Sequence, residues 1–61
     1  MAFLGIANER ERRLAQEEAA SAIERYGDRA ATVLSMKAQQ TQSAQRRVVY
    51  KLARKIVMGP A

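Results

Sequence analysis

Apolar residues recur at intervals of three and four along most of this chain, which is the spacing of helices with one buried face. Between positions 9 and 26 no residue breaks a helix, and most residue types there favour one. Asn8 precedes this segment as a good N-cap residue, and the carboxylates of Glu9 and Glu11 suit the positive end of the helix dipole. The pattern predicts a helix over residues 9–26. Its apolar face consists of Ala15, Ala19, Ala22, Ile23 and Tyr26.

A corner between two helices is predicted at Gly27 and Asp28. Glycine adopts the left-handed backbone conformation most readily, so we expect Gly27 to end the first helix. Asp28 is expected to cap the N-terminus of the next helix with its side chain. This second helix is predicted over residues 29–40. Its apolar face consists of Ala30, Val33, Leu34 and Ala38.

The polar run that follows leaves two topologies open, because it contains neither Gly nor Pro. The chain either turns near residues 41–43, where Thr41 or Ser43 caps a third helix over residues 43–58, or continues as one helix over residues 29–58. The unbroken helix would be roughly 44 Å long and would overhang the first helix, which is roughly 27 Å long. The overhang would expose the strongest apolar stripe of the chain, so we favour the turn. That stripe consists of Val48, Val49, Leu52, Ala53 and Ile56.

The predicted fold class is therefore all-α: a single small helical bundle with a corner at Gly27 and Asp28. Three helices are favoured, and the alternative is a two-helix hairpin with a long second helix. Gly59 and Pro60 are expected to stop the last helix.

A thin hydrophobic core is the main weakness of this bundle. Twelve of the 61 residues are alanine, and Leu, Ile, Val and Phe together number only 12. A chain of this length buries only about 60% of its unfolded surface, so we expect a partner or a second copy to complete the core. Residues 1–7 form a short apolar arm before the first helix. The candidate self-association residues are Phe3, Leu4, Ile6, Val48, Val49, Leu52 and Ile56.

The composition argues against an enzyme. The chain has no cysteine and no histidine, which removes disulfides, the commonest metal ligands and the commonest general base. Its six carboxylates are scattered, and Glu17 and Glu24 share a helix face that is most simply a solubilising one. We therefore expect no catalytic site, no metal, no cofactor and no small-molecule substrate. No apolar run approaches the ~20 residues of a membrane span, and no signal peptide is recognisable, so the expected location is the cytoplasm.

A basic face on the third predicted helix is the one candidate binding site. The net charge is +5, and four cations fall within about 100° of arc on that helix, flanked by Arg46. They are Arg47, Lys51, Arg54 and Lys55. An ordinary solvated face is the favoured interpretation, and the alternatives are binding to nucleic acid, to an acidic protein or, least favoured because the chain has no Trp, to a membrane surface. Tyr26 and Tyr50 are interpreted as half-buried core residues rather than as stacking platforms for bases.

The run from Ala22 to Ala30 resembles a pattern in a family of small uncharacterised bacterial helical proteins. In that family an Ala-x-x-Ile helix ends in an aromatic residue or His followed by Gly, and a third helix carries an aromatic and an aliphatic stripe, here Tyr50, Leu52, Ala53 and Ile56. The resemblance covers residues 15–57. The chain departs from the pattern at Gln42 and Ser43, where the family usually has Gly-Asp before the third helix. The resemblance implies three short helices and no particular activity.

The functional hypothesis that follows is a non-enzymatic protein–protein interaction module that self-associates. The first alternative is a small basic nucleic-acid-binding protein that uses the cationic face of its last helix. The second alternative is an accessory subunit that folds on a larger assembly.

Overall fold

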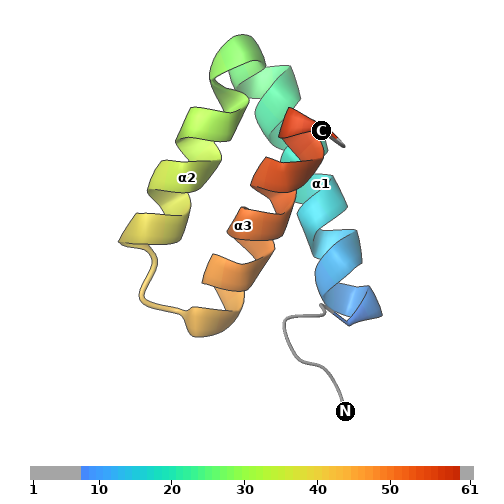
Figure 1. Cartoon of the computed structure of the whole chain (residues 1–61), viewed down its shortest axis with the longest axis vertical. Coiled ribbons are helices and arrows are strands. Elements are labelled where there is room, and N and C mark those ends of the chain that lie inside the picture. Colours follow the sequence, from blue (N-terminus) through green and yellow to red (C-terminus); the bar gives the residue numbers. More distant parts are fainter. Residues whose placement is uncertain (1–7, 60–61) are drawn as a thin grey trace.

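The computed structural model describes residues 8–59, and its regular structure is entirely helical (Figure 1). The elements are α1 (Glu9–Tyr26), the 3-10 turn η1 (Gly27–Arg29), α2 (Ala30–Gln40) and α3 (Ala44–Met58). The predicted all-helical class is therefore confirmed. The apolar arm with Phe3, Leu4 and Ile6 lies outside the described residues.

Helix α1 begins where the sequence predicts, because side chains satisfy its free backbone donors. The Asn8 carboxamide oxygen accepts a hydrogen bond from the Glu11 N–H at 2.7 Å, and the Glu11 carboxylate accepts one from the Asn8 N–H at 3.3 Å. This reciprocal pair is a capping box. It satisfies two backbone donors at the N-terminus and fixes the first helical residue.

The corner after α1 depends on the positive φ of Gly27, which is +56°. The Gly27 N–H still donates to the Ile23 carbonyl, so α1 closes normally before the chain bends. Asp28 does not cap α2, which corrects the prediction. The backbone continues through a 3-10 turn in which the Ala30 N–H donates to the Gly27 carbonyl, so Asp28 lies inside this turn. Helix α2 therefore begins at Ala30, and Arg29 precedes it without a capping side chain.

The chain leaves the helical conformation between Gln40 and Ala44, at the polar run. Thr41 has extended backbone angles, and its hydroxyl accepts a hydrogen bond from the Ser43 N–H at 3.2 Å. The Ser43 hydroxyl in turn accepts one from the Arg46 N–H at 3.2 Å, which caps α3. Counted as uninterrupted helical stretches, the described chain has two, residues 9–40 and 44–58, and the corner at Gly27 divides the first into α1 and α2.

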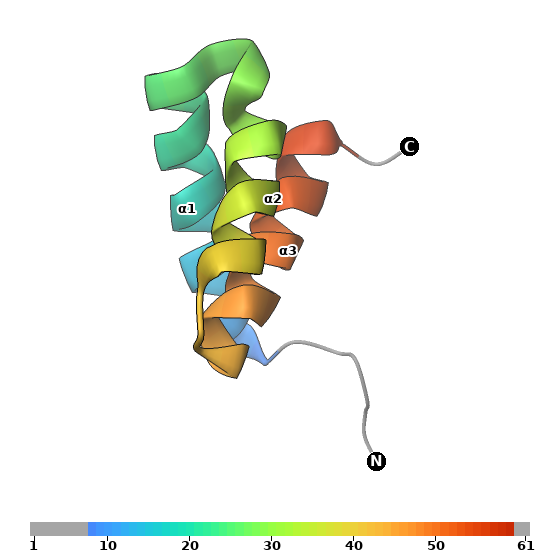
Figure 2. The same ribbon diagram turned by 90° about the vertical axis from the view of Figure 1, so that its left-hand side faces the viewer.

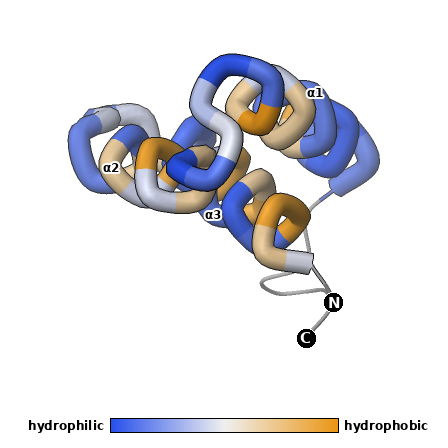
Figure 3. The backbone as a smooth tube through the Cα atoms, turned by 90° about the horizontal axis from the view of Figure 1, so that it is seen from above, coloured by the Kyte–Doolittle hydropathy of each residue, from blue (hydrophilic) through white to orange (hydrophobic). Residues whose placement is uncertain are grey.

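Helix α3 packs against both other helices and completes the core. It runs in the same direction as α1 and opposite to α2 (Figures 1 and 2). Hydrophilic positions cover the outer sides of α1 and α2 (Figure 3). Among the described residues, Leu34 is the only large side chain that is fully buried. The buried set is Ala15, Ala19, Ala22, Ala30, Leu34, Ala38, Val49 and Ala53.

Several apolar residues lie elsewhere than predicted. Ile23 and Tyr26 were expected on the buried face of α1, but they are 50% and 39% exposed, because the three alanines of α1 fill the contact. Val49 was expected at a self-association surface. It is instead buried in the core of one chain, where it is not accessible to a second copy.

Candidate anion-binding groove

Charge is segregated along the chain. All six carboxylate side chains lie between Glu9 and Asp28, whereas no Asp or Glu follows position 28. Seven of the eleven Lys and Arg residues lie after that position. The part of the protein formed by α2 and α3 is therefore cationic without internal compensation, and it attracts anions.

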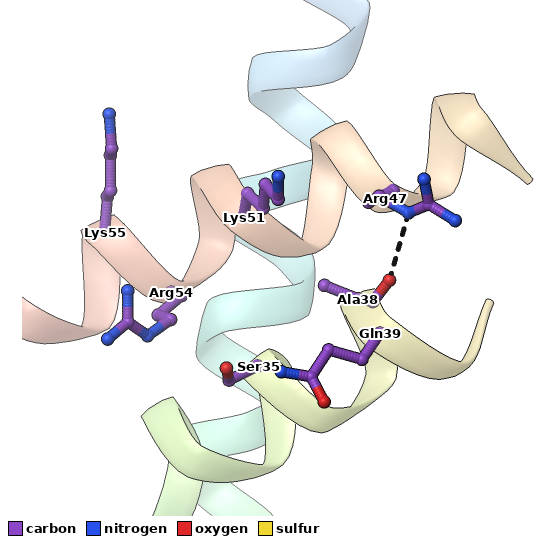
Figure 4. Close-up of a pocket in the computed structure, with 7 residues that line it drawn as sticks. All are labelled: Ser35, Ala38, Gln39, Arg47, Lys51, Arg54 and Lys55. Atoms are coloured by element: carbon purple, nitrogen blue, oxygen red, sulfur yellow. Dashed lines mark hydrogen bonds between the residues drawn. The ribbon is translucent and has the colours of Figure 1, made fainter.

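Four of these cations line one groove between α2 and α3. Arg47, Lys51, Arg54 and Lys55 approach it from α3 (Figure 4). Helix α2 contributes the other wall, which consists of Ser35, Ala38 and Gln39. The groove has a volume of about 520 Å³, and no carboxylate of residues 8–59 lines it. The structure thus brings together four of the five cations that the sequence predicted as an anion-binding set.

Arg47 has a defined structural role at the edge of this groove. Its Nε donates a hydrogen bond to the Ala38 carbonyl at 3.2 Å, and its Nη2 donates one to the Thr41 carbonyl at 3.1 Å (Figure 4 shows the first). Carbonyls in the last turn of a helix have no partner within the helix and carry the negative end of its dipole. Arg47 therefore caps the C-terminus of α2 from α3 and ties the two helices together.

The other three cations are exposed and differ in direction. The Arg54 side chain descends from α3 on the side of α2 and lines the groove together with Ser35, whereas Lys55 extends away from α2 (Figure 4). Lys51 comes from α3 between Arg54 and Arg47. Within residues 8–59, none of these three side chains forms a hydrogen bond with another protein group. Arg54 and Lys51 therefore keep their donors available for a ligand in the groove.

Arg46 does not belong to this groove, although the sequence placed it beside the basic face. It lines a separate cavity of about 310 Å³ between α1 and α3, together with Leu14, Glu18, Val49 and Tyr50. The reason is helical geometry, since neighbouring residues point about 100° apart and Arg47 already faces α2. Arg46 is thus directed toward α1, which carries five of the six carboxylate side chains.

Neither tyrosine lines the groove. Tyr50 is partly buried against the core, as predicted, and the Nζ of Lys37 lies 5.9 Å from the centroid of its ring. Tyr26 is the last residue of α1 and is exposed. Among the described residues, the groove therefore offers charge and hydrogen-bond donors but no aromatic surface.

Ser35 and Gln39 are the groove residues that sequence reasoning missed. They lie four positions apart on α2, so they share a face, and that face adjoins the buried Ala38. This spacing was readable in the sequence. Neutral polar residues on a helix nevertheless give no sign of a site until the facing helix is known.

Two other kinds of site are absent from the described part of the chain. In residues 8–59, no three carboxylates come close enough to hold a metal ion. No helix within that range has the length and apolar character needed to cross a membrane. No family model matches the chain, and neither curated proteins nor solved structures show significant similarity to it.

Proposed function

We propose that this protein binds nucleic acid through the phosphate backbone, using the groove between α2 and α3. The observation that carries the proposal is the convergence of four cations on a groove that no carboxylate lines, in a half of the protein that contains no acidic residue. Phosphate contacts made by Lys and Arg supply most of the affinity of sequence-independent nucleic-acid binding.

The spacing of the cations supports a polymer rather than one small anion. The free cations Lys51 and Lys55 lie four residues apart, which corresponds to a step of about 6 Å along α3. Arg54 projects from the same side toward α2. A row of cations at this spacing can contact successive phosphates of one strand, and the absence of an aromatic wall favours contact with the backbone over stacking on bases.

The packing of α3 argues against a membrane surface. A basic amphipathic helix binds lipid by inserting its apolar face between the headgroups. In this bundle the centre of that face, Val49 and Ala53, is buried against the other helices. Inserting that centre into lipid would therefore require the bundle to open, whereas binding to phosphates requires only the exposed basic side.

The test is a salt titration of binding to a short fluorescent DNA duplex, measured by anisotropy. Because Arg47 is engaged with α2, the three free cations contact three phosphates, or two where Lys51 and Arg54 share one, which predicts a slope of roughly −1.8 to −2.7 for log K against log salt concentration. The double variant Lys51→Gln/Arg54→Gln should bring this slope to roughly −0.9, since it leaves only the contact made by Lys55.

The matched control is Arg10→Gln/Arg13→Gln, which removes the same charge from exposed positions of α1. It should keep the wild-type slope. Equal losses of affinity and slope in the two double variants would mean that overall charge, and not the groove, attracts the nucleic acid. That result would overturn the proposal.

A second candidate function is self-association, or assembly on a larger partner, through the outer edge of the apolar stripe of α3. Val48 and Ile56 are 42% and 45% exposed, and the partly buried Leu52 lies between them on the same face. Sedimentation equilibrium over a wide concentration range tests it. A chain that stays monomeric throughout would exclude self-association.

A further inference from the structure

We infer that the groove is a two-helix seat for one phosphate group of the bound strand, formed by Arg54 and Lys51 of α3 and by Ser35 and Gln39 of α2. In this arrangement Arg47 is a positioning residue and not a phosphate ligand. The inference rests on the proposed function and adds the neutral half of the site, which the charge distribution alone does not reveal.

The α2 wall presents free hydrogen-bonding groups at the place where Arg54 arrives. The Ser35 and Gln39 side chains lie on the groove side of α2, and Arg54 lines the same groove from α3 (Figure 4). Within residues 8–59, neither α2 side chain forms a hydrogen bond with another protein group. A phosphate between the helices can accept hydrogen bonds from both neutral donors while the two cations balance its charge.

Arg47 makes the groove suitable for an anion without contacting it. Without Arg47, the Ala38 carbonyl in the last turn of α2 and the Thr41 carbonyl just beyond the helix would lack these partners, and their partial negative charge would repel a phosphate. Two donors of the Arg47 guanidinium occupy these carbonyls. The same bonds hold α3 against α2 and thereby fix the separation between Arg54 and Ser35.

The size of the groove fits a phosphate that carries part of its strand. Its volume of about 520 Å³ lies inside the range of roughly 300–1,000 Å³ that is usual for small-molecule sites. A lone inorganic anion would leave much of that space to water. A phosphodiester with an adjoining sugar fills it better, which agrees with a ligand of nucleotide chemistry.

Neutral substitutions on α2 separate this seat from general charge attraction. Ser35→Ala and Gln39→Ala should each weaken duplex binding by about 2- to 10-fold, which is the usual effect of one hydrogen bond, and should leave the salt slope unchanged. The matched controls are Ser21→Ala and Gln16→Ala, which change the same residue types at exposed positions of α1. These controls should bind like the wild type. Wild-type affinity in both α2 variants would overturn the seat. If Lys51→Gln/Arg54→Gln still made the salt slope less steep, the proposed function would stand without the seat.

Arg47 gives a separate readout. Arg47→Gln should lower the melting temperature and weaken duplex binding while keeping the wild-type salt slope, because Arg47 neutralises carbonyls and not a phosphate. A slope that becomes less steep by about 0.9 would mean that Arg47 contacts a phosphate directly, against the inference. Arg47→Lys should be destabilised as well, since an ammonium group cannot reproduce the two-donor fork.

Inorganic pyrophosphate is the probe that separates the seat from the proposed function. In an NMR titration of the full chain, it should shift the signals of the Gln39 carboxamide, the Arg54 Nε–H and the Ser35 amide, and the shifts should disappear in Lys51→Gln/Arg54→Gln. Such shifts in a protein that does not bind the duplex would uphold the seat and refute nucleic-acid binding. Shifts spread evenly over α1 and α3 would refute the seat.

Discussion

Replacing Leu34 with alanine tests where the stability of this bundle resides. Leu34 lies in the middle of α2 and is 0% exposed, and every other fully buried residue among those described is an alanine. Alanines permit close helix contact but bury little apolar area each. The apolar free energy of the core is therefore concentrated in this side chain and in its partly buried neighbours.

The expected loss is large relative to the total. Removing a fully buried leucine side chain costs about 2–5 kcal/mol, depending on how far the surroundings collapse into the space. A chain of 61 residues has a total free energy of unfolding of roughly 3–9 kcal/mol. Leu34→Ala should therefore remove about half of the stability, or unfold the protein outright at room temperature.

Urea unfolding followed by circular dichroism at 222 nm measures this loss. The control is Met36→Ala, two positions away on the same helix, where the side chain is 50% exposed and the expected change is within about 0.5 kcal/mol. Similar midpoints for Leu34→Ala and the wild type would refute the reasoning. That outcome would mean that contacts between chains, and not the core within one chain, hold the helices together.

Three further substitutions test local features of the structure. Asn8→Ala removes half of the capping box and should lower the free energy of unfolding by about 1 kcal/mol in the same urea assay. Gly27→Ala should lower it by about 1–3 kcal/mol through backbone strain alone, because φ is +56° with ψ at −120° and a Cβ would meet no atom within 4 Å; an unchanged midpoint would contradict the positive φ at this corner. Ile56→Ser should leave the melting temperature at low protein concentration nearly unchanged, but should abolish any rise of that temperature with concentration if α3 pairs with a second copy.

The sequence predicts a helix boundary where it has a residue type with a distinctive capping or backbone property. Asn8 and Gly27 delimit α1 at the residues expected, because each has a property that few other residue types share. The start of α2 is one residue later than predicted, since the 3-10 turn uses a backbone donor where a side-chain cap was expected from Asp28. The start of α3 remained open between two hydroxyl residues. In the structure both act, Thr41 within the turn and Ser43 as the cap.

Of the candidate site, only the wall formed by α3 could be predicted from the sequence. Helical periodicity places Arg47, Lys51, Arg54 and Lys55 on one side of α3 whatever that helix packs against. The role of Arg47 depends on which helix end lies opposite it, and the contribution of Ser35 and Gln39 depends on how the chain turns at residues 41–43. Both features depend on the tertiary structure and not on the local sequence. The burial of Val49 likewise depends on where α1 packs, and the apolar pattern of α3 gives no information about that position.

The same cations that attract a ligand also oppose the fold. Seven positive charges and no carboxylate side chain lie on α2, α3 and their connections, around a core with one large buried side chain, so their mutual repulsion acts against a small stabilising term. Screening by salt weakens this repulsion between exposed charges, whereas it also weakens binding to phosphates. Thermal stability should therefore rise with salt concentration over the range in which duplex affinity falls, and Lys51→Gln/Arg54→Gln should melt at a higher temperature than the wild type at low salt. A lower melting temperature for that variant would show that the two side chains stabilise the bundle through contacts. The groove would then be explained by packing and would lose its support as a binding site.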